Sequence, residues 1–268
     1  METVTIGSAT LVRGDARDVL ASTTDKAVDF IFTDPPFGHR NNDNGDLISR
    51  REVALGHGPV RAGRPIANDG REEADELVRF LFNEARRLLP PGAVLACCCG
   101  GGGVTMARWT LWMEELLGHK MTVVWDKGFG MGWHYRRSYE VVLTGQRPGG
   151  KSRWYDTTRR VTNVIRPDDG IKRIIPKAED HPTPKPPALA GHFIALHSQP
   201  GHLVMDPFMG GGSTAEAAIL AERRFLGVEL DARFFDMACQ RAERAEKLRR
   251  MLTEGGANQN EKDGAKVG

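Results

Sequence analysis

The sequence predicts an α/β protein with one mostly parallel sheet that is covered by helices on both faces. Short apolar runs of strand length alternate along the chain with longer segments in which apolar residues recur at helical spacing. Strands that alternate with helices form parallel sheets. The chain has 268 residues, of which 40% are hydrophobic and 27% are charged. This length and composition suit one globular α/β domain with a small insertion.

The first strand and the first long helix are well delimited. Residues 28–32 (VDFIF) are apolar and end at a proline turn, as expected for a buried strand. Between Glu72 and Leu89, apolar residues recur every three or four positions, which predicts an amphipathic helix that stops before Pro90. The chain therefore opens with a buried strand that a long connection joins to a helix.

The alternation continues to about residue 245. We predict strands at Ala93–Cys99, Met121–Trp125, Tyr139–Thr144, His202–Met205 and Phe225–Val228. We predict helices at Val104–Leu117 and Lys185–His197, at the segment that opens at Gly212-Ser213, and after Asp231. Ser213 and Glu216 have the spacing of a capping box, so the Ser213 side chain is expected to cap its helix.

Three segments depart from this pattern. Residues 39–71 have no period and are rich in Arg, Gly, Asn and Asp, so we expect a mobile loop there. Residues 146–177 hold nine Lys or Arg against three Asp, on a chain whose net charge is only +2. This basic island suggests a surface that faces a polyanion, although a solvated surface explains it too. The polar, Gly-rich tail 254–268 is expected to be disordered.

The composition argues against several classes of protein. No apolar run approaches the ~18 residues that span a bilayer, and the first residues lack the basic and apolar regions of a signal peptide. The four cysteines include the run 97–99 and match neither a zinc site nor a disulfide framework, and the histidines have no ligand spacing. We therefore expect a cytoplasmic protein with no metal and no membrane partner.

A glycine-rich motif between a predicted strand and a predicted helix is the strongest sign of function. Residues 206–214 read DPFMGGGST, and Glu229 ends the next strand. Glycines at such a turn let a ligand approach the backbone, and an acidic side chain about 20 residues later can accept hydrogen bonds from ribose hydroxyls. The spacing differs from Gly-x-Gly-x-x-Gly. The motif therefore predicts a nucleoside-containing cofactor; a turn that serves packing alone is the alternative.

A second motif, Asp34-Pro35-Pro36-Phe37, follows the first buried strand. The two prolines fix the backbone, so the Asp34 carboxylate and the Pro35 carbonyl can converge on one point. Two such acceptors suit an exocyclic amino group, and the Phe37 ring offers a face on which a planar base can stack. An ordinary proline turn would explain the tetrapeptide equally well if it stood alone.

The order of these motifs resembles that of the β class of DNA amino-methyltransferases, the permuted group that methylates adenine N6 or cytosine N4 with S-adenosylmethionine. The segment TDPPF (33–37) comes first, followed by the basic segment, HPTPKP (181–186), DPFMGGGST and GVELD (227–231). The resemblance covers roughly residues 10–245. It implies a permuted Rossmann-like fold with a catalytic half at 1–145, a target-recognition segment at 146–180 and a cofactor-binding half at 181–253.

The resemblance assigns catalysis to Asp34, Pro35, Pro36 and Phe37. In the family the Asp form of this loop is associated chiefly with adenine, so the resemblance implies a site-specific enzyme that methylates N6 of a flipped-out adenine in double-stranded DNA. Phe37 stands where Tyr is more frequent, which retains stacking and loses a hydroxyl contact. A cytosine-N4 enzyme is the nearest alternative. A non-catalytic DNA-binding module is the alternative from a different class.

The resemblance also implies which residues bind S-adenosylmethionine and DNA. The cofactor site would comprise Asp15, Thr183, Lys185, Asp206, Pro207, Phe208, Gly210, Gly212, Ser213, Thr214 and Glu229. Within it, Asp15 would read the cofactor adenine, although a helix cap explains it equally well, and Lys185 would meet the methionine carboxylate. The DNA contacts would be Arg136, Arg137, Lys151, Arg153, Trp154, Arg159 and Arg160, for which a solvated basic surface is the alternative. Related enzymes are often dimers, so a homodimer is expected by analogy.

Overall fold

The computed structural model describes residues 1–38, 66–100, 103–131, 134–172, 181 and 183–264. Within these residues one nine-stranded sheet has the order β1-β2-β9-β8-β3-β4-β6-β5-β7. Its strands are β1 (Glu2–Ile6), β2 (Ala9–Arg13), β3 (Phe30–Thr33), β4 (Val94–Cys99), β5 (His119–Met131), β6 (Arg137–Gln146), β7 (Val164–Ile165), β8 (Leu203–Asp206) and β9 (Arg224–Glu229). The helices are α1 (Ala16–Ser22), α3 (Arg71–Leu88), α4 (Gly103–Leu116), α5 (Pro187–His197), α6 (Ser213–Leu220) and α7 (Ala232–Gly264), with a 3-10 turn at Pro167–Asp169.

The centre of the sheet is parallel, as predicted. Strands β2, β9, β8, β3 and β4 all run in one direction, and the only reversals in the described sheet are the β1–β2 hairpin and β6, which lies antiparallel between β4 and β5. The carboxyl ends of parallel strands meet at one edge of a sheet, where ligands bind in open α/β folds. We call this the carboxyl edge; it carries the residues that follow β2, β3, β8 and β9.

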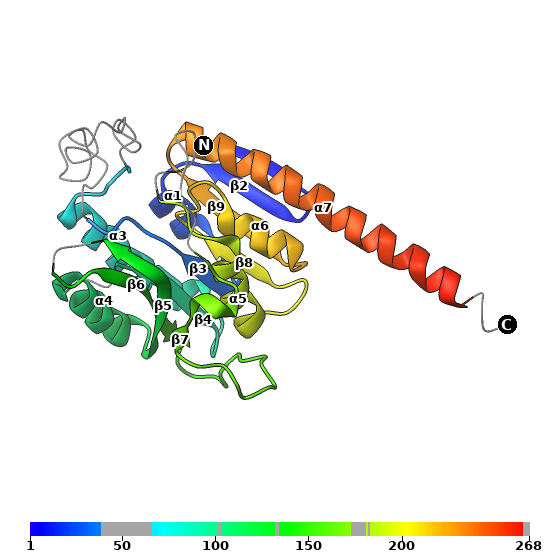
Figure 1. The fold of residues 1–268 in the computed structure, drawn as a ribbon. Coiled ribbons are helices and arrows are strands. Elements are labelled where there is room, and N and C mark those ends of the chain that lie inside the picture. The colour runs from blue at the N-terminus through cyan, green and yellow to red at the C-terminus, as the bar shows by residue number, and fades with distance from the viewer. Residues whose placement is uncertain (39–65, 101–102, 132–133, 173–180, 182, 265–268) are drawn as a thin grey trace, which may run out of the picture.

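Helices cover both faces of the sheet (Figure 1). On one face α5, α6 and α7 bury Phe193, Ala215 and Phe235 against the strands. On the other face α1, α3 and α4 bury Leu20, Phe82 and other apolar side chains. Burial on both faces explains why β3 and β4 read as continuous apolar runs rather than as alternating ones.

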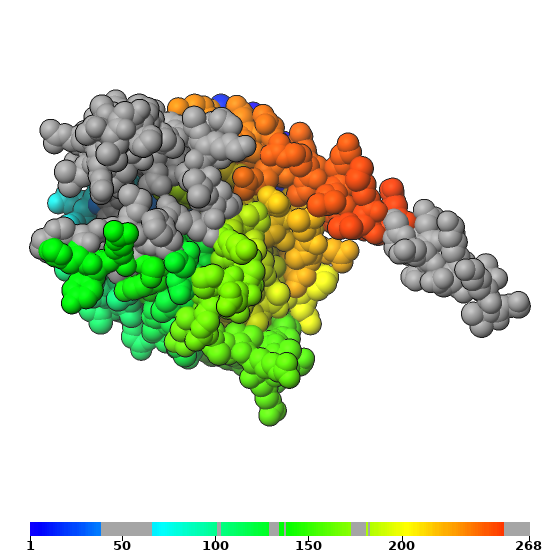
Figure 2. Space-filling view, in the orientation of Figure 1, coloured from blue at the N-terminus to red at the C-terminus, as the bar shows by residue number. Residues whose placement is uncertain are grey.

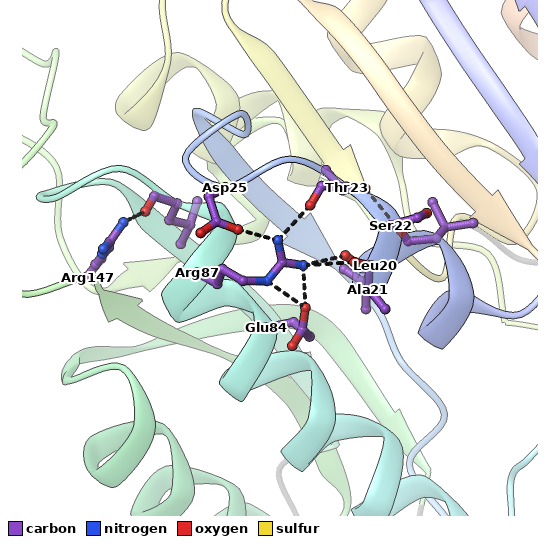
Figure 3. A network of polar contacts seen from close by, with 10 residues as sticks. Leu20, Ala21, Ser22, Thr23, Asp25, Glu84, Arg87 and Arg147 are labelled. Carbon is purple, nitrogen blue, oxygen red and sulfur yellow. Dashed lines mark hydrogen bonds and ion pairs between the residues drawn. The ribbon is translucent and has the colours of Figure 1, made fainter.

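A half-buried guanidinium joins the ends of two helices on the second face (Figure 3). Arg87, in the last turn of α3, donates to the carbonyls of Thr23 at 2.6 Å and Leu20 at 2.8 Å, at the end of α1. It also pairs with Glu84 at 2.6 Å and Asp25 at 2.5 Å. These contacts fix the end of α1 against α3, so the start of α1 is held at the carboxyl edge.

One local prediction was wrong. Ser213 does not cap α6, because Gly212 occupies the cap position in the left-handed conformation, with φ 80°, and no side-chain cap bond forms. Helix α7 continues to Gly264, into the segment 254–268 whose disorder stays a prediction.

Strand lengths also differ from the predictions. The hairpin of β1 and β2 was not predicted, and β5 and β6 extend beyond the expected apolar cores into polar residues. Most of the predicted loop 39–71 lies outside the described residues, and its last residue, Arg71, begins α3. Residues 173–180 of the predicted target-recognition segment also lie outside them.

Candidate active site

A cavity of about 330 Å³ opens at the carboxyl edge of the sheet. It is formed by the segments that follow β2, β3, β8 and β9, together with the segment before α5. The predicted catalytic and cofactor residues that line it are Asp15, Asp34, Pro35, Pro36, Phe37, Thr183, Lys185, Asp206, Pro207, Phe208, Gly210, Ser213, Thr214 and Glu229. Motifs far apart in the sequence thus meet around one cavity.

In the catalytic candidate Asp34, the two carboxylate oxygens differ in their hydrogen bonding. Its Oδ2 accepts a hydrogen bond from the Lys185 ammonium at 2.7 Å. Its Oδ1 is buried and has no hydrogen-bond partner among the residues that the structure describes. Burial raises the pKa of Asp34, and the nearby Lys185 charge opposes that rise. A buried acceptor without a partner is unfavourable unless a ligand supplies the donor.

Lys185 is held by two carboxylates, and its expected contact with the cofactor carboxylate stays a prediction. Its ammonium lies 2.7 Å from Asp34 and 3.2 Å from Glu140, and the side chain is only 9% exposed. The Glu140 carboxylate also pairs with Lys127 at 2.8 Å. Four alternating charges therefore run from β5 through β6 to the catalytic loop. The two cations lower the pKa of Glu140 to about 2.

The Phe37 ring is fixed from two sides. Its edge-to-face contact with Trp109 has a centroid distance of 6.1 Å, and the Lys185 ammonium lies 5.3 Å from its centroid. Trp109 is fully buried, and its indole N–H donates to Asp75 at 2.8 Å. The ring that we expect to stack on a base therefore rests on a rigid partner.

The glycine turn after β8 is tied to the end of β9. Glu229 accepts hydrogen bonds from the backbone N–H of Gly210 at 3.0 Å and of Asp231 at 2.7 Å. Burial raises the pKa of Glu229 to about 7 despite these bonds. Gly210 has a φ of 49°, a conformation that favours glycine. A carboxylate at the mouth of this turn fits the ribose of a nucleoside cofactor.

Asp206 links the two halves of the site and has little capacity left for a ligand. Its carboxylate accepts bonds from the hydroxyls of Thr33 at 2.7 Å and Thr214 at 2.6 Å, and from the Phe208 N–H at 3.1 Å. Thr33 directly precedes Asp34. Asp206 and Thr214 therefore hold the catalytic loop against the glycine turn, and their expected contacts with the cofactor stay a prediction.

Two other predicted cofactor residues have structural roles. Gly212 does not line the cavity; a Cβ at this position would lie 2.8 Å from the Ala238 Cα, so the glycine serves packing against α7. Asp15 lines the cavity but also caps α1, accepting from the Arg17 N–H at 2.8 Å. Its expected contact with the cofactor adenine stays a prediction.

Most of the predicted DNA-contacting residues lie at the end of the sheet opposite the carboxyl edge, where the parallel strands begin; we call this the far edge. Arg153 pairs with Asp29 at 2.7 Å, just before β3 begins, and Trp154 packs edge-on against His197 at the end of α5. The segment between β6 and β7, which carries Lys151, Arg153, Trp154, Arg159 and Arg160, projects at the bottom of Figure 1, away from the tip of β5. Arg136 is exposed beside the cavity end of β6, where Arg137 begins the strand. None of the five predicted DNA-contacting residues of the segment between β6 and β7 lines the cavity.

Several residues of the site were not assigned to it from the sequence. They are Glu140 and Lys127, which complete the charge row, Trp109 beneath Phe37, and His181 and Phe234, whose rings meet edge to face at 4.4 Å on the cavity wall. Glu140 offered one signal, because a carboxylate next to the apolar run 141–143 of a predicted strand requires a buried partner.

The fold and the cavity define an S-adenosylmethionine-dependent methyltransferase. A family model described as DNA methylase matches residues 28–240. The chain therefore belongs to the DNA methylase family.

Relatives and solved structures agree with this family. The Escherichia coli (strain K12) protein YubD is 28% identical over 249 residues, covering 92% of this chain and 94% of YubD. The DNA adenine methyltransferase YhdJ of the same strain is 24% identical over 264 residues, covering 87% and 82%. The protein TTHA0409 of Thermus thermophilus, complexed with S-adenosyl-L-methionine, has a TM-score of 0.60 at 26% identity, covering 88% and 95%.

The PvuII DNA methyltransferase, which is cytosine-N4-specific, has a TM-score of 0.66 at 14% identity, with 94% of each chain covered. This likeness shows the fold alone. Among the residues that the structure describes, no helix is both long and apolar enough to cross a membrane. The described side chains also contain no group of three or more His, Cys, Asp or Glu arranged to hold a metal ion.

Proposed function

We propose that this DNA methyltransferase transfers the methyl group of S-adenosylmethionine to N6 of an adenine that is flipped out of double-stranded DNA, at a specific sequence. The observation that carries the proposal is the buried Oδ1 of Asp34, which lies beside Phe37 and has no hydrogen-bond partner in the described part of the chain. An exocyclic amino group supplies the missing donor, and the adenine ring gives Phe37 a stacking partner. The name of YhdJ, a relative called a DNA adenine methyltransferase, also favours adenine.

The chain's own residues account for the activation of the amino group. Its lone pair is delocalised into the ring, so the nitrogen is a poor nucleophile while it remains planar. Asp34 and the Pro35 carbonyl accept hydrogen bonds from its two N–H groups. These bonds favour a pyramidal nitrogen as positive charge develops, which stabilises the transition state electrostatically. When bound, S-adenosylmethionine supplies an activated sulfonium methyl group. The protein then mainly aligns the reacting atoms.

Residues of both halves would hold the cofactor. Glu229 would accept bonds from the ribose hydroxyls, the Gly210 turn would let the ligand approach the backbone, and Thr183 and Phe208 would contact it from the cavity wall. Flipping the base out of the duplex costs a few kcal/mol, which contacts in this cavity must offset.

The test is to incubate the purified protein with S-adenosylmethionine and mixed genomic DNA and to map modified bases at single-nucleotide resolution. N6-methyladenine within one repeated motif is expected. N4-methylcytosine would refute the adenine assignment. Asp34→Ala should abolish transfer and retain cofactor binding, because Asp34 contacts the base rather than the cofactor. A wild-type protein that fails to bind S-adenosylmethionine would favour a non-catalytic DNA-binding role.

We also propose that DNA approaches the carboxyl edge, because a flipped base must reach Asp34. Arg136 is exposed at that edge, whereas Arg159 is exposed at the far edge. Each phosphate contact adds about one unit to the salt dependence of DNA binding. Arg136→Ala should therefore flatten the dependence of affinity on salt, and Arg159→Ala should not. The opposite result would restore the basic island as the DNA surface.

The expected homodimer is likewise a proposal. Its support in this chain is the outer part of α7, which extends beyond the body of the protein (Figure 2) and exposes Leu248, Met251 and Leu252 at helical spacing. Light scattering on the purified protein would show twice the chain mass. A monomer at micromolar concentration would refute the proposal.

A further inference from the structure

The row of charges behind the catalytic loop has a feature that charge neutralisation alone does not require. Lys185 could be satisfied by Asp34 alone, yet its ammonium is shared with Glu140, which comes from a different part of the sheet. Glu140 lies on β6 opposite Trp125 of β5, so its backbone is fixed by strand pairing. Lys127 lies two residues after Trp125 on β5, and its ammonium donates to the other carboxylate oxygen of Glu140.

This arrangement determines how strongly Lys185 binds Asp34. A buried ammonium that pairs with only one carboxylate interacts strongly with it and withdraws electron density from it, so that carboxylate becomes a weaker acceptor for other donors. A second carboxylate at 3.2 Å takes part of that interaction. The Oδ1 oxygen of Asp34 is then a better hydrogen-bond acceptor.

We propose that Glu140 is a positioning residue for methyl transfer, which shares Lys185 with Asp34 and thereby keeps Asp34 oriented and basic enough to grip the target amino group. The proposal rests on the proposed amino-methyl transfer. Glu140 acts through Lys185 and need not touch the base or the cofactor.

The electrostatics around Asp34 agree with this role. Lys185 lowers the pKa of Asp34 and Glu140 raises it. The other titratable groups that face Asp34 are Asp206 and the thiols of Cys97, Cys98 and Cys99. Burial raises the pKa of each of these thiols, which keeps them neutral. All four groups remain unchanged when Glu140 or Lys185 is substituted, so differences between those variants report the two partners.

The test compares the pH dependence of kcat in the wild type, Glu140→Gln and Lys185→Gln. Asp34 must be ionised to accept the amino hydrogen, so kcat falls on the acid side. Removing the Glu140 charge lowers the pKa of Asp34, which moves the acid limb to lower pH. Removing the Lys185 charge raises that pKa, which moves the acid limb to higher pH. If Glu140 only stabilised the fold and did not act on the Asp34–Lys185 pair, the acid limb would stay where it is in the wild type.

At the pH optimum, Glu140→Gln should lower kcat by about tenfold or more, since displacement of a catalytic group by about 1 Å can cost 100-fold. The Kd for S-adenosylmethionine, measured by calorimetry, should change less than about twofold, which also shows that the variant is folded. Glu246→Gln is the matched control, because Glu246 is an ion-paired carboxylate of α7 with 7% side-chain exposure, held by Arg249 and Arg250, and it does not line the cavity. It should leave both quantities unchanged.

The outcomes separate the two proposals. A wild-type protein that transfers no methyl group would refute the proposed function and this inference with it. An active wild type, together with a Glu140→Gln variant of normal kcat and unshifted acid limb, would refute the inference alone. Loss of cofactor binding in Glu140→Gln would also overturn it, because the residue would then support the cofactor half.

Discussion

The affinity for S-adenosylmethionine should depend on pH through Glu229. Burial raises the pKa of this carboxyl to about 7 in the cofactor-free protein. If the ribose hydroxyls donate to an ionised carboxylate, binding requires the deprotonated form. At pH 8 about nine-tenths of the protein is then competent, and at pH 6 about one-tenth is. The Kd should therefore rise about tenfold between pH 8 and pH 6, a loss of about 1.4 kcal/mol.

Isothermal titration calorimetry at several pH values measures this dependence directly. Glu229→Gln is the control, since it cannot titrate while the amino group of the ligand titrates identically in both experiments. The variant should bind more weakly at pH 8 and show no additional loss toward pH 6. Equal pH profiles for the wild type and the variant would show that Glu229 does not meet the ribose, and the reasoning from its burial would be refuted.

Three other substitutions test the supports of the site. Trp109→Phe should lower kcat several-fold with little change in cofactor Kd, because an aromatic pair that positions Phe37 contributes about 1 kcal/mol; an unchanged kcat would remove Trp109 from catalysis. Burial lowers the pKa of His197 to about 4, below its ordinary value near 6.5, so the unfolded state binds the proton first and stability is lost as pH falls. Urea unfolding should show a loss of about 2 kcal/mol between pH 7.5 and 5 that His197→Phe lacks; equal losses would contradict this. Gly212→Ala should destabilise the fold by about 1–3 kcal/mol, because of its φ of 80° and the contact with Ala238; an unchanged urea midpoint would count against strain there.

The fold class and the two main motifs could be predicted because their signals are local. Apolar runs of strand length and helical periodicity follow from burial on two faces of a sheet, and prolines and glycines mark turns wherever they occur. The tetrapeptide 34–37 and the turn at 206–212 each follow a predicted strand. Because carboxyl ends of parallel strands share one edge, their meeting around a cavity could be anticipated.

The partners of the charged residues could not be predicted in this way. Lys185 is 151 positions from Asp34, and Thr33 is 173 positions from Asp206. No local pattern states which carboxylate a buried ammonium meets, because only the packed sheet brings those side chains within hydrogen-bond distance. The packed sheet is what pairs Asp206 with Thr33 and Glu140 with Lys185.

The sequence by itself determined the order of the elements, the turn chemistry at the carboxyl edge and the residue types of the cavity. Only the tertiary structure decided on which edge the basic segment lies. Strand β6 runs antiparallel to β4, with Gln146 paired to Val94, so the chain leaves the sheet at the amino-terminal end of β4. Strand direction depends on pairing between distant segments, and apolar periodicity is the same for either direction. Composition therefore revealed a basic segment but not that it begins on the side away from Asp34.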